Sequence, residues 1–461
     1  MPMPSATRRH RQHLERAVPG PILVMAGAAR VRNIPINHLP FRADSSFLYL
    51  TGCTTPDAAV LLHDGRHTLF LPEPPPGDAL WHGPQPSIEE QAQALGFEHT
   101  APRRTLSEAL QDLPLSPSTL ATTDPATNRW LSVQTKREHD WKTDPGTPAL
   151  VDALIQLRSQ LDADEVAAIR AVARVTEAAH RAAMAATRPG RTEAIIGATF
   201  DAAIAARGHR TAYDAIVTVR GEVLHNFHRV HPLRDGDLLL LDGGAEGASG
   251  YATDVTRTWP VSGTFSPRQR SAYHAVLAAQ RRGIEMCTPG VRYRDIHLEA
   301  ARVLTRWMVD ERILSGDIDH LVERGAHALF FPHGVGHLIG LDVHDLELYG
   351  DRAGYGPGRK RSDQFGLNAL RLDRDLAPGN VVTIEPGFYA VPEILQTSSL
   401  TEPFADALDL DRAMGWLGFG GIRIEDDIYV TEGEPEVLTG SIPVTIADVE
   451  AAIAADFSPF D

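Results

Sequence analysis

Cysteine is scarce in this sequence of 461 residues, which has only Cys53 and Cys287. The two lie far apart and belong to no paired-thiol motif. This excludes a disulfide scaffold and a thiolate zinc site, and it fits a reducing compartment. We therefore expect a cytoplasmic protein.

Long apolar runs are missing as well. No stretch reaches the roughly 20 apolar residues that a helix needs to cross a bilayer, so we expect no membrane partner. The first residues carry Arg8, Arg9, Arg11 and Arg16 without an apolar run after them, which predicts no signal peptide.

A basic surplus is also absent. The net charge is −16, from 60 acidic and 44 basic residues. Proteins that bind nucleic acids usually show a basic excess or stripe, so the composition argues against that class. An acidic balance is compatible with binding divalent cations but does not by itself indicate a site.

The N-terminal part of the chain mixes short apolar runs with turn residues. Strands are predicted over 22–25, 47–50, 58–62 and 68–71, and helices over 88–95 and 106–113. Such alternation indicates a small α/β domain, which we place at residues 1–158.

The remainder, residues 159–461, repeats one pattern twice. Helices are predicted over 164–186 and 193–208, and again over 266–287 and 293–310. A strand ending in an acid follows in each half, with Asp242 and Glu385 separated by 143 residues. Gly236 and Gly379 are separated by the same offset. Two such halves facing each other would bring the acids together at a pseudo-two-fold centre.

Four acids stand near predicted strand ends. Asp242 follows four leucines, and burial of a lone carboxylate is costly unless a charge or metal compensates it. A glycine-rich hairpin would set Asp254 beside it, although a pairing of Asp254 with Arg257 is an equal alternative. Glu385 and Glu425 occupy comparable places in the second half.

Three histidines, His333, His337 and His344, fall within twelve residues among several glycines. The glycines and Pro332 argue against a helix, and therefore against a helical zinc pair. The clustering favours a functional role over a structural one. His225, alone near the first acidic strand, is a weaker candidate. Four carboxylates with one imidazole suit Mn²⁺ and similar cations.

Taken together, these motifs resemble the pita-bread metallopeptidases, and within them the proline-specific branch of aminopeptidase P and prolidase. Residues 41–52 and the Trp81-His-Gly83 segment are part of the resemblance. It implies an α/β (α+β) fold, with a small N-terminal domain followed by a pita-bread (creatinase/aminopeptidase) catalytic domain. It also implies hydrolysis of the N-terminal Xaa-Pro bond of peptides with proline in second position.

The resemblance implies two divalent metal ions, Mn²⁺ with Co²⁺ or Zn²⁺ as substitutes. Asp254 and Glu425 would bridge both ions, while Asp242 would hold one and His337 with Glu385 the other. Glu385 would also carry the proton from the nucleophile to the leaving amine. The implied ligand set is Asp242, Asp254, His337, Glu385 and Glu425.

Further residues match positions that contact the substrate or support the site. His344 and His225 would contact the substrate and stabilise the oxyanion. His333 would shape the pocket, and Arg423 would support the Glu425 strand. Trp81 matches a tryptophan that in several relatives reaches a neighbouring subunit, which implies a homodimer or homotetramer.

A long segment, residues 350–376, departs from the shorter aminopeptidase P pattern. Within it Arg371 matches a prolidase arginine that holds the carboxylate of a dipeptide, with a solvated loop as the alternative. Prolidase is therefore the nearest alternative function. A metal-free binding module is a third, disfavoured because all five ligand positions are filled. Methionine aminopeptidase and creatinase share the fold.

Overall fold

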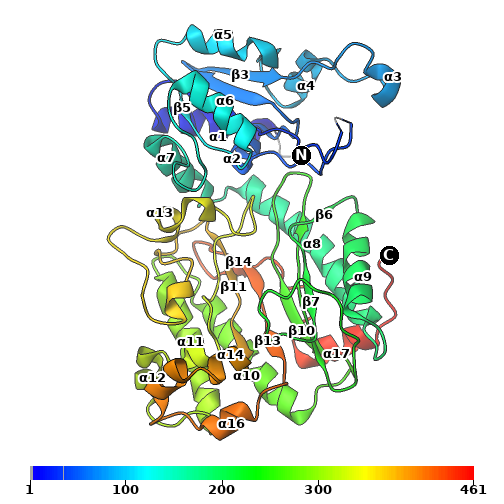
Figure 1. The fold of residues 1–461 in the computed structure, drawn as a ribbon, viewed down its shortest axis with the longest axis vertical. Coiled ribbons are helices and arrows are strands. Elements are labelled where there is room, and N and C mark those ends of the chain that lie inside the picture. The colour runs from blue at the N-terminus through cyan, green and yellow to red at the C-terminus, as the bar shows by residue number, and fades with distance from the viewer. Residues whose placement is uncertain (1–3, 35, 461) are drawn as a thin grey trace. The chain divides into compact units, whose positions relative to one another are not determined.

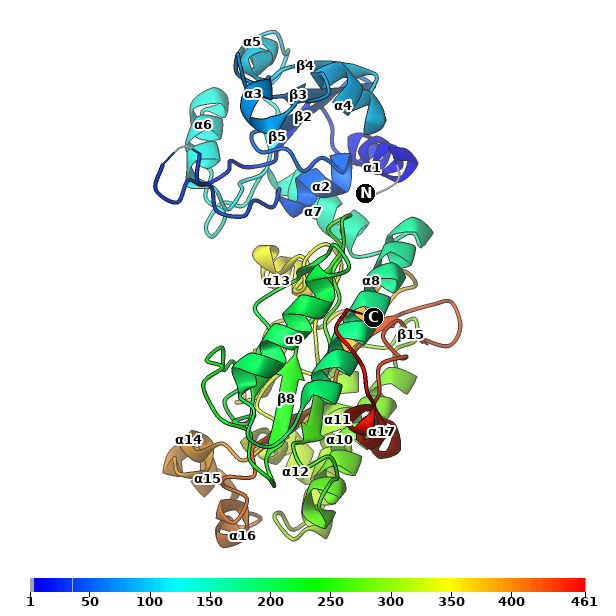
Figure 2. The same cartoon turned by 90° about the vertical axis from the view of Figure 1, so that its right-hand side faces the viewer.

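The computed structural model describes residues 4–34 and 36–460 (Figures 1 and 2). Two compact units make up the chain. Unit 1 comprises residues 1–159 with 248–250, and unit 2 comprises residues 160–247 with 251–461.

A mixed sheet with the strand order β4-β3-β2-β1-β5 forms the centre of unit 1. The inner pairs are antiparallel and the outer pairs parallel. The β2–β3 hairpin turns through Asp64 and Gly65, whose φ angles of 51° and 75° are both left-handed, as a type I′ turn requires. The strands are β1 (Ile22–Met25), β2 (Ala59–His63), β3 (Arg66–Leu71), β4 (His99–Pro102) and β5 (Ser118–Thr119).

Helices surround this sheet (Figure 1). One core of unit 1 joins Leu23, Leu61 and Phe70 of the sheet to Leu106 and Leu131 of the helices α5 and α6. The helices of unit 1 are α1 (Pro4–Ala17), α2 (Ser45–Thr51), α3 (Ala79–His82), α4 (Ile88–Ala94), α5 (Leu106–Gln111), α6 (Pro125–Thr135) and α7 (Pro148–Arg158), with the 3₁₀ turn η1 (Arg103–Thr105).

One prediction for unit 1 is wrong. Residues 47–50, expected as a strand, lie within α2. The Asp44 side chain accepts hydrogen bonds from the backbone N–H groups of Ser46 and Phe47, and Gly52 ends the helix with φ 65°. Every residue of α2 is buried, so the apolar run carries no periodicity that separates helix from strand. The other predicted elements are confirmed to within about two residues at their ends.

Unit 2 contains the predicted repeat. Its first half has α8 (Ala163–Ala186) and α9 (Glu193–Ala205), and its second half has α10 (Pro267–Glu285) and α11 (Tyr293–Asp310). Capping boxes start α8 and α10, and Gly190 and Gly290 take left-handed φ angles of 87° and 84° between the paired helices. The four predicted helices are therefore confirmed.

The strands of unit 2 form small sheets, with the orders β10-β8-β7, β11-β14-β15, β12-β13 and β6-β9. Gly236 and Gly379, with φ angles of 90° and 93°, turn the chain before β8 and β11, so the repeat extends to backbone conformation. The strands are β6 (Arg210–Thr211), β7 (Ile216–Thr218), β8 (Leu238–Asp242), β9 (Ala245–Glu246), β10 (Thr256–Pro260), β11 (Val381–Ile384), β12 (Gly387–Tyr389), β13 (Gly421–Arg423), β14 (Asp426–Tyr429) and β15 (Glu436–Val437).

The two halves of unit 2 join where β10 meets β13. Arg423 N–H donates to Thr258 Oγ1 at 3.2 Å, and Glu425 N–H donates to Thr256 O at 3.0 Å. The remaining helices are α12 (Ile318–Arg324), α13 (Asp351–Gly354), α14 (Pro392–Leu395), α15 (Ser398–Thr401), α16 (Leu410–Met414) and α17 (Ile446–Ala454), with the 3₁₀ turns η2 (Ala326–Leu329), η3 (Glu347–Tyr349), η4 (Leu367–Ala369) and η5 (Glu402–Phe404).

The predicted α/β (α+β) architecture with an internal repeat is confirmed. Within residues 4–34 and 36–460, no helix is both long and apolar enough to cross a membrane.

Candidate active site

The two acids of the first half lie at one end of the β8–β10 hairpin. Asp242 is the last residue of β8 and pairs across the ladder with Thr256, and Asp254 stands two residues before Thr256. The predicted hairpin is thus confirmed. Arg257 is buried and donates from Nη2 to Asp426 Oδ1 at 2.8 Å, so its carboxylate partner is Asp426 rather than Asp254.

The two acids of the second half come from β11 and the link between β13 and β14. Glu385 directly follows β11, and Glu425 is the residue before β14. Thr256 Oγ1 donates to Glu425 Oε2 at 2.6 Å, which connects the first half to the second. Because β10 meets β13, acids that are far apart in sequence gather at one centre.

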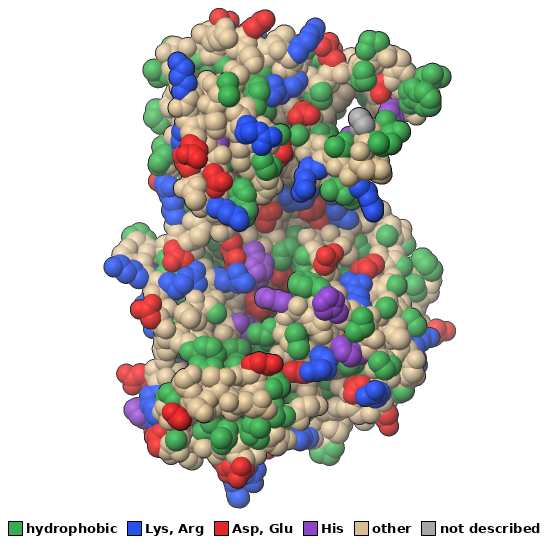
Figure 3. Space-filling model, viewed as in Figure 1, with side chains coloured by type: hydrophobic (Ala, Val, Ile, Leu, Met, Phe, Trp, Pro, Cys, Tyr) green, Lys and Arg blue, Asp and Glu red, His purple; other side chains and the backbone are tan. Residues whose placement is uncertain are grey.

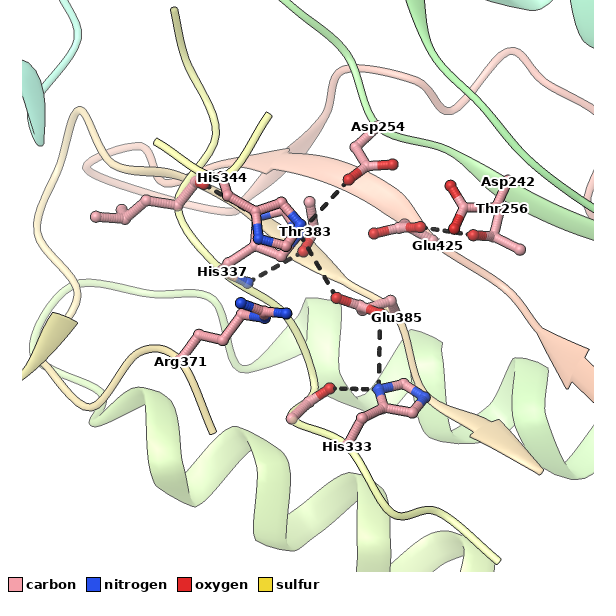
Figure 4. Close-up of polar contacts among 12 residues, drawn as sticks. Asp242, Asp254, Thr256, His333, His337, His344, Arg371, Thr383, Glu385 and Glu425 are labelled. Atoms are coloured by element: carbon pink, nitrogen blue, oxygen red, sulfur yellow. Dashed lines mark hydrogen bonds and ion pairs between the residues drawn. The ribbon is translucent and has the colours of Figure 1, made fainter. Parts of the chain in front are cut away.

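Ligand atoms of these residues form three overlapping groups, and within each group they lie within 4.8 Å of one another (Figure 4). Asp254, Glu425 and His337 each belong to two groups. The groups are Asp242 with Asp254 and Glu425, His337 with Glu385 and Glu425, and Asp254 with His337 and His344.

His337 is held with one ring nitrogen toward the acids. Its Nδ1 lies 3.0 Å from Leu338 O, and because a carbonyl only accepts, Nδ1 donates there. Nε2 lies 3.5 Å from Asp254 Oδ2 and 3.6 Å from Glu385 Oε1 (Figure 4). These distances exceed ordinary hydrogen bonds. They suit donor atoms arranged around a shared cation, with the second nitrogen fixed by a backbone carbonyl.

The excess of negative charge in the cluster also favours cation binding. Burial raises the pKa of Glu385 to about 7 and that of Glu425 well above its usual value. Arg423 donates from Nη2 to Asp242 Oδ2 at 2.6 Å, and one guanidinium cannot balance four carboxylates. Buried acids this close repel one another unless they share protons or a metal ion. The oxygen-rich donor set with one imidazole therefore fits divalent cations.

A chain of hydrogen bonds supports the centre from behind. Arg423 Nη1 donates to Tyr389 Oη at 3.0 Å, Tyr389 Oη lies 2.9 Å from His333 Nε2, and His333 Nδ1 lies 2.8 Å from Gly334 O. The Arg423 guanidinium can only donate and the Gly334 carbonyl can only accept. Tyr389 therefore donates to His333, and His333 donates to Gly334. Burial lowers the pKa of His333 to about 3, which keeps its ring neutral.

Three further residues, which no sequence pattern indicated, hydrogen-bond at the site. Tyr213 Oη lies 2.6 Å from Asp242 Oδ1 and also contacts Asp254 Oδ1. Asp427 accepts the backbone N–H of Asp254 at 3.2 Å. Tyr389 belongs to the hydrogen-bond chain described above. No spacing signal marks Tyr213 or Tyr389, whereas Asp427 could have been suspected from its place two residues after Glu425.

A pocket of about 400 Å³ opens beside the acids. Histidine side chains gather on the same unit's surface in Figure 3. His344 is partly exposed, and its ring stacks on His337 with centroids 4.0 Å apart. The pocket is lined by Tyr213, Asp214, Ile216, His225, Phe227, Asp242, Asp254, Val343 and His344.

A second pocket, of about 270 Å³, is lined by His337. Arg371 lines it and donates from Nη1 to Glu347 Oε2 at 2.7 Å. Trp81, the remaining predicted residue, lies in α3 of unit 1 and is 80% exposed.

Comparisons with known proteins agree with this geometry. Residues 167–432 match the model of metallopeptidase family M24, and residues 6–120 match that of the aminopeptidase P N-terminal domain. The human Xaa-Pro dipeptidase is 31% identical, over 96% of this chain and 91% of the human protein. The Xaa-Pro aminopeptidase of Haemophilus influenzae is 32% identical, over 89% of this chain and 88% of that protein.

A solved structure is similar along nearly the whole length. The zinc-substituted Escherichia coli aminopeptidase P in complex with product superposes with a TM-score of 0.79 at 28% identity, covering 98% of both chains. The family model alone spans more than half of the chain and includes all five predicted ligand positions. The chain therefore belongs to metallopeptidase family M24, with an aminopeptidase P type N-terminal region ahead of its catalytic part.

Proposed function

We propose that this protein hydrolyses the peptide bond between an N-terminal residue and a proline in second position. The observation that carries the proposal is the largely buried cluster of four carboxylates and His337, which opens onto a pocket lined by His225 and His344. Relatives that resemble the chain over most of its length are named Xaa-Pro aminopeptidases and Xaa-Pro dipeptidases.

Two divalent cations are the proposed cofactors. Asp254 and Glu425 would be shared, because each belongs to two donor groups and a carboxylate can offer one oxygen to each ion. Asp242 would serve one ion and Glu385 the other, together with His337, which has only Nε2 to offer. Bound cations supply polarisation of a carbonyl and a lowered pKa of water at this site. We propose Mn²⁺ on the basis of the oxygen-rich donor set, with Co²⁺ or Zn²⁺ as substitutes.

The protein's own residues would move protons and hold the substrate. The Glu385 carboxylate would take a proton from the attacking water and deliver it to the proline nitrogen as the C–N bond breaks. His344 and His225 would contact the carbonyl oxygen as negative charge builds on it. We propose that His333 shapes the pocket and that Arg423 orients Asp242, because the Arg423 side chain is 5% exposed and lies in the hydrogen-bond chain.

The requirement for proline can be tested directly. Peptides that differ only in their second residue, proline or alanine, should be cleaved at very different rates, because the proposed specificity is for the imino acid. The measurement is kcat/KM by detection of the released N-terminal residue. Comparable values for both peptides would place the enzyme among general aminopeptidases.

The prolidase alternative is the same chemistry confined to dipeptides. Arg371 is the observation that favours it, since its side chain is 40% exposed at the second pocket and could bind a carboxylate. Comparing Xaa-Pro dipeptides with longer Xaa-Pro peptides separates the two functions.

We also propose a domain boundary at residue 158, a cytoplasmic location and a homodimer or homotetramer that involves Trp81. The free, buried Cys53 and Cys287 support a reducing compartment. Light scattering coupled to gel filtration would test the assembly, and Trp81→Ala should weaken it.

A further inference from the structure

Glu347 connects two residues that the proposed function uses separately. Its Oε2 lies 3.1 Å from His344 Nδ1 and 2.7 Å from Arg371 Nη1 (both partners are labelled in Figure 4). Its other oxygen, Oε1, is buried and has no hydrogen-bond partner among the residues that the structure describes. One carboxylate oxygen therefore holds a proposed catalytic histidine and a proposed substrate clamp together.

The backbone before Glu347 is strained. Leu346 has φ 64°, a left-handed conformation that residues with a Cβ rarely adopt, and it is 2% exposed. Such strain persists only where the surrounding structure over-determines it, and it is concentrated at functional sites. Leu346 directly precedes η3, whose first residue is Glu347. The strained turn therefore fixes where Glu347 lies in the fold.

The ion pair changes what Arg371 can do. Arg371 hydrogen-bonds to no other residue within 4–34 and 36–460, so its Nε and Nη2 donors stay available to the pocket. A dipeptide ends in a carboxylate just beyond its proline, and a guanidinium could bind it through two parallel bonds. Glu347 already supplies negative charge there. A substrate carboxylate must compete with it and approach a like charge, whereas a longer peptide presents a neutral amide.

We propose that Glu347 determines substrate length: by holding Arg371 in an internal ion pair it disfavours dipeptides and selects peptides of three or more residues. The same carboxylate accepts a hydrogen bond from His344 Nδ1 and so orients that ring toward the first pocket. This inference rests on the proposed Xaa-Pro hydrolysis and specifies its substrate class.

The first test uses the unaltered protein with two substrates. An Xaa-Pro dipeptide and its C-terminal amide differ only in the terminal charge. If Glu347 repels the carboxylate, the amide should be cleaved with a kcat/KM about tenfold higher, chiefly through KM. Equal values, or a preference for the free acid, would overturn the inference. If neither of these nor a longer Xaa-Pro peptide is cleaved while the protein is loaded with Mn²⁺, the proposed function fails instead.

The second test uses Glu347→Gln. The amide oxygen of glutamine can still accept from His344, but the charge beside Arg371 is gone. The ratio of dipeptide to tripeptide kcat/KM should rise about tenfold, because any effect of the change on His344 applies to both substrates and cancels in the ratio. The gain should vanish when Arg371→Ala is added, because the two residues act as a pair. A gain that survives Arg371→Ala, or an unchanged ratio, would contradict the inference.

Asp375→Asn is the matched control. Asp375 is an exposed acid of the same 350–376 segment, and it pairs with Arg359 at 2.6 Å rather than with Arg371. Removing its charge should leave the length ratio unchanged. A rise equal to that of Glu347→Gln would show that general charge, and not the Glu347 ion pair, sets substrate length.

Discussion

At the scale of single residues, Asp254 and Glu425 differ from His344 in what they touch. Both acids are buried and shared between donor groups, whereas the His344 side chain is 40% exposed and lines the larger pocket. Replacing a residue that holds cations should therefore reduce metal binding, whereas replacing a residue that contacts substrate should reduce turnover.

Asp254→Ala or Glu425→Ala should lose bound metal, because in the proposed site each carboxylate would serve both cation positions. His344→Ala should keep its metal but lose turnover by roughly two or more powers of ten, as the loss of one oxyanion donor does. Metal content by mass spectrometry after Mn²⁺ loading, together with kcat, separates these outcomes. Loss of metal from His344→Ala would make His344 a ligand, which its grouping with Asp254 and His337 would then explain.

Arg371→Ala tests the arginine as a carboxylate clamp. Without Arg371 the charge of Glu347 is no longer neutralised, so the KM for Xaa-Pro dipeptides should rise by about tenfold, while longer peptides should be nearly unaffected. Lys360→Ala, which removes an exposed cation of the same segment, is the control. Equal losses on short and long substrates would show that Arg371 only supports the fold, and no loss would leave it as solvated surface.

At the scale of elements, the segment 350–376 is anchored rather than loose. Asp373 is 1% exposed and accepts two hydrogen bonds, both at 2.6 Å, from the side chain of Arg292, the residue directly before α11. Leu370 and Leu372, on either side of Arg371, are buried. The backbone at Arg371 is thereby fixed between two buried leucines, which favours a specific role for its side chain over that of a flexible cation.

The contact between α11 and η2 buries two histidines. The rings of His297 and His327 lie 5.7 Å apart, and none of their nitrogens has a hydrogen-bond partner in the described part of the chain. Burial lowers the pKa of His327 to about 4, and burial together with His327 lowers the pKa of His297 further. Both rings are therefore neutral in the folded protein at neutral pH.

The folded pKa of His327 lies below the ordinary value of 6.5, so the unfolded chain binds more protons between these values. The free energy of unfolding should therefore be unaffected by His327 above about pH 7 and should fall by up to ~3 kcal/mol as the pH drops toward 4. His327→Phe should flatten this decline, measured by urea unfolding between pH 7.5 and 5. His274→Gln, at an exposed histidine of α10, should reproduce the unaltered curve. An unchanged decline in His327→Phe would contradict the prediction.

At the scale of the whole molecule, the proposed cations would link the two halves of unit 2. Asp242 and Asp254 come from the first half and Glu385 and Glu425 from the second, so without cations four acids repel one another at the junction. Cation binding to the folded state alone should therefore stabilise the molecule.

A chelator should abolish activity and lower the Tm by several degrees, and Mn²⁺ should restore both, with Co²⁺ or Zn²⁺ as weaker substitutes. Calorimetry of the same samples used for kinetics checks the two effects together. Glu425→Ala is the control and should show no Mn²⁺-dependent rise in Tm. Full activity of a metal-free preparation would refute the dinuclear site.

The sequence by itself determined the repeat and the acids. Helical periodicity predicted α8 to α11. The separation of Asp242 and Glu385, equal to that of the two glycines before them, predicted matching strands. Both patterns can be read along the chain without knowledge of packing. The same reasoning failed at residues 47–50, where complete burial left no periodicity to read. There the hydrogen bonds accepted by the Asp44 side chain start a helix.

Only the tertiary structure decided which polar side chains meet. Arg257 binds Asp426, Tyr213 reaches both Asp242 and Asp254, and Glu347 joins His344 to Arg371, although their separations in sequence follow no common rule. The physical reason is that these contacts depend on how β10 meets β13 and on the strained turn at Leu346. Neither leaves a periodic signal, because side-chain hydrogen bonds are set by distances in space and not by spacing along the chain.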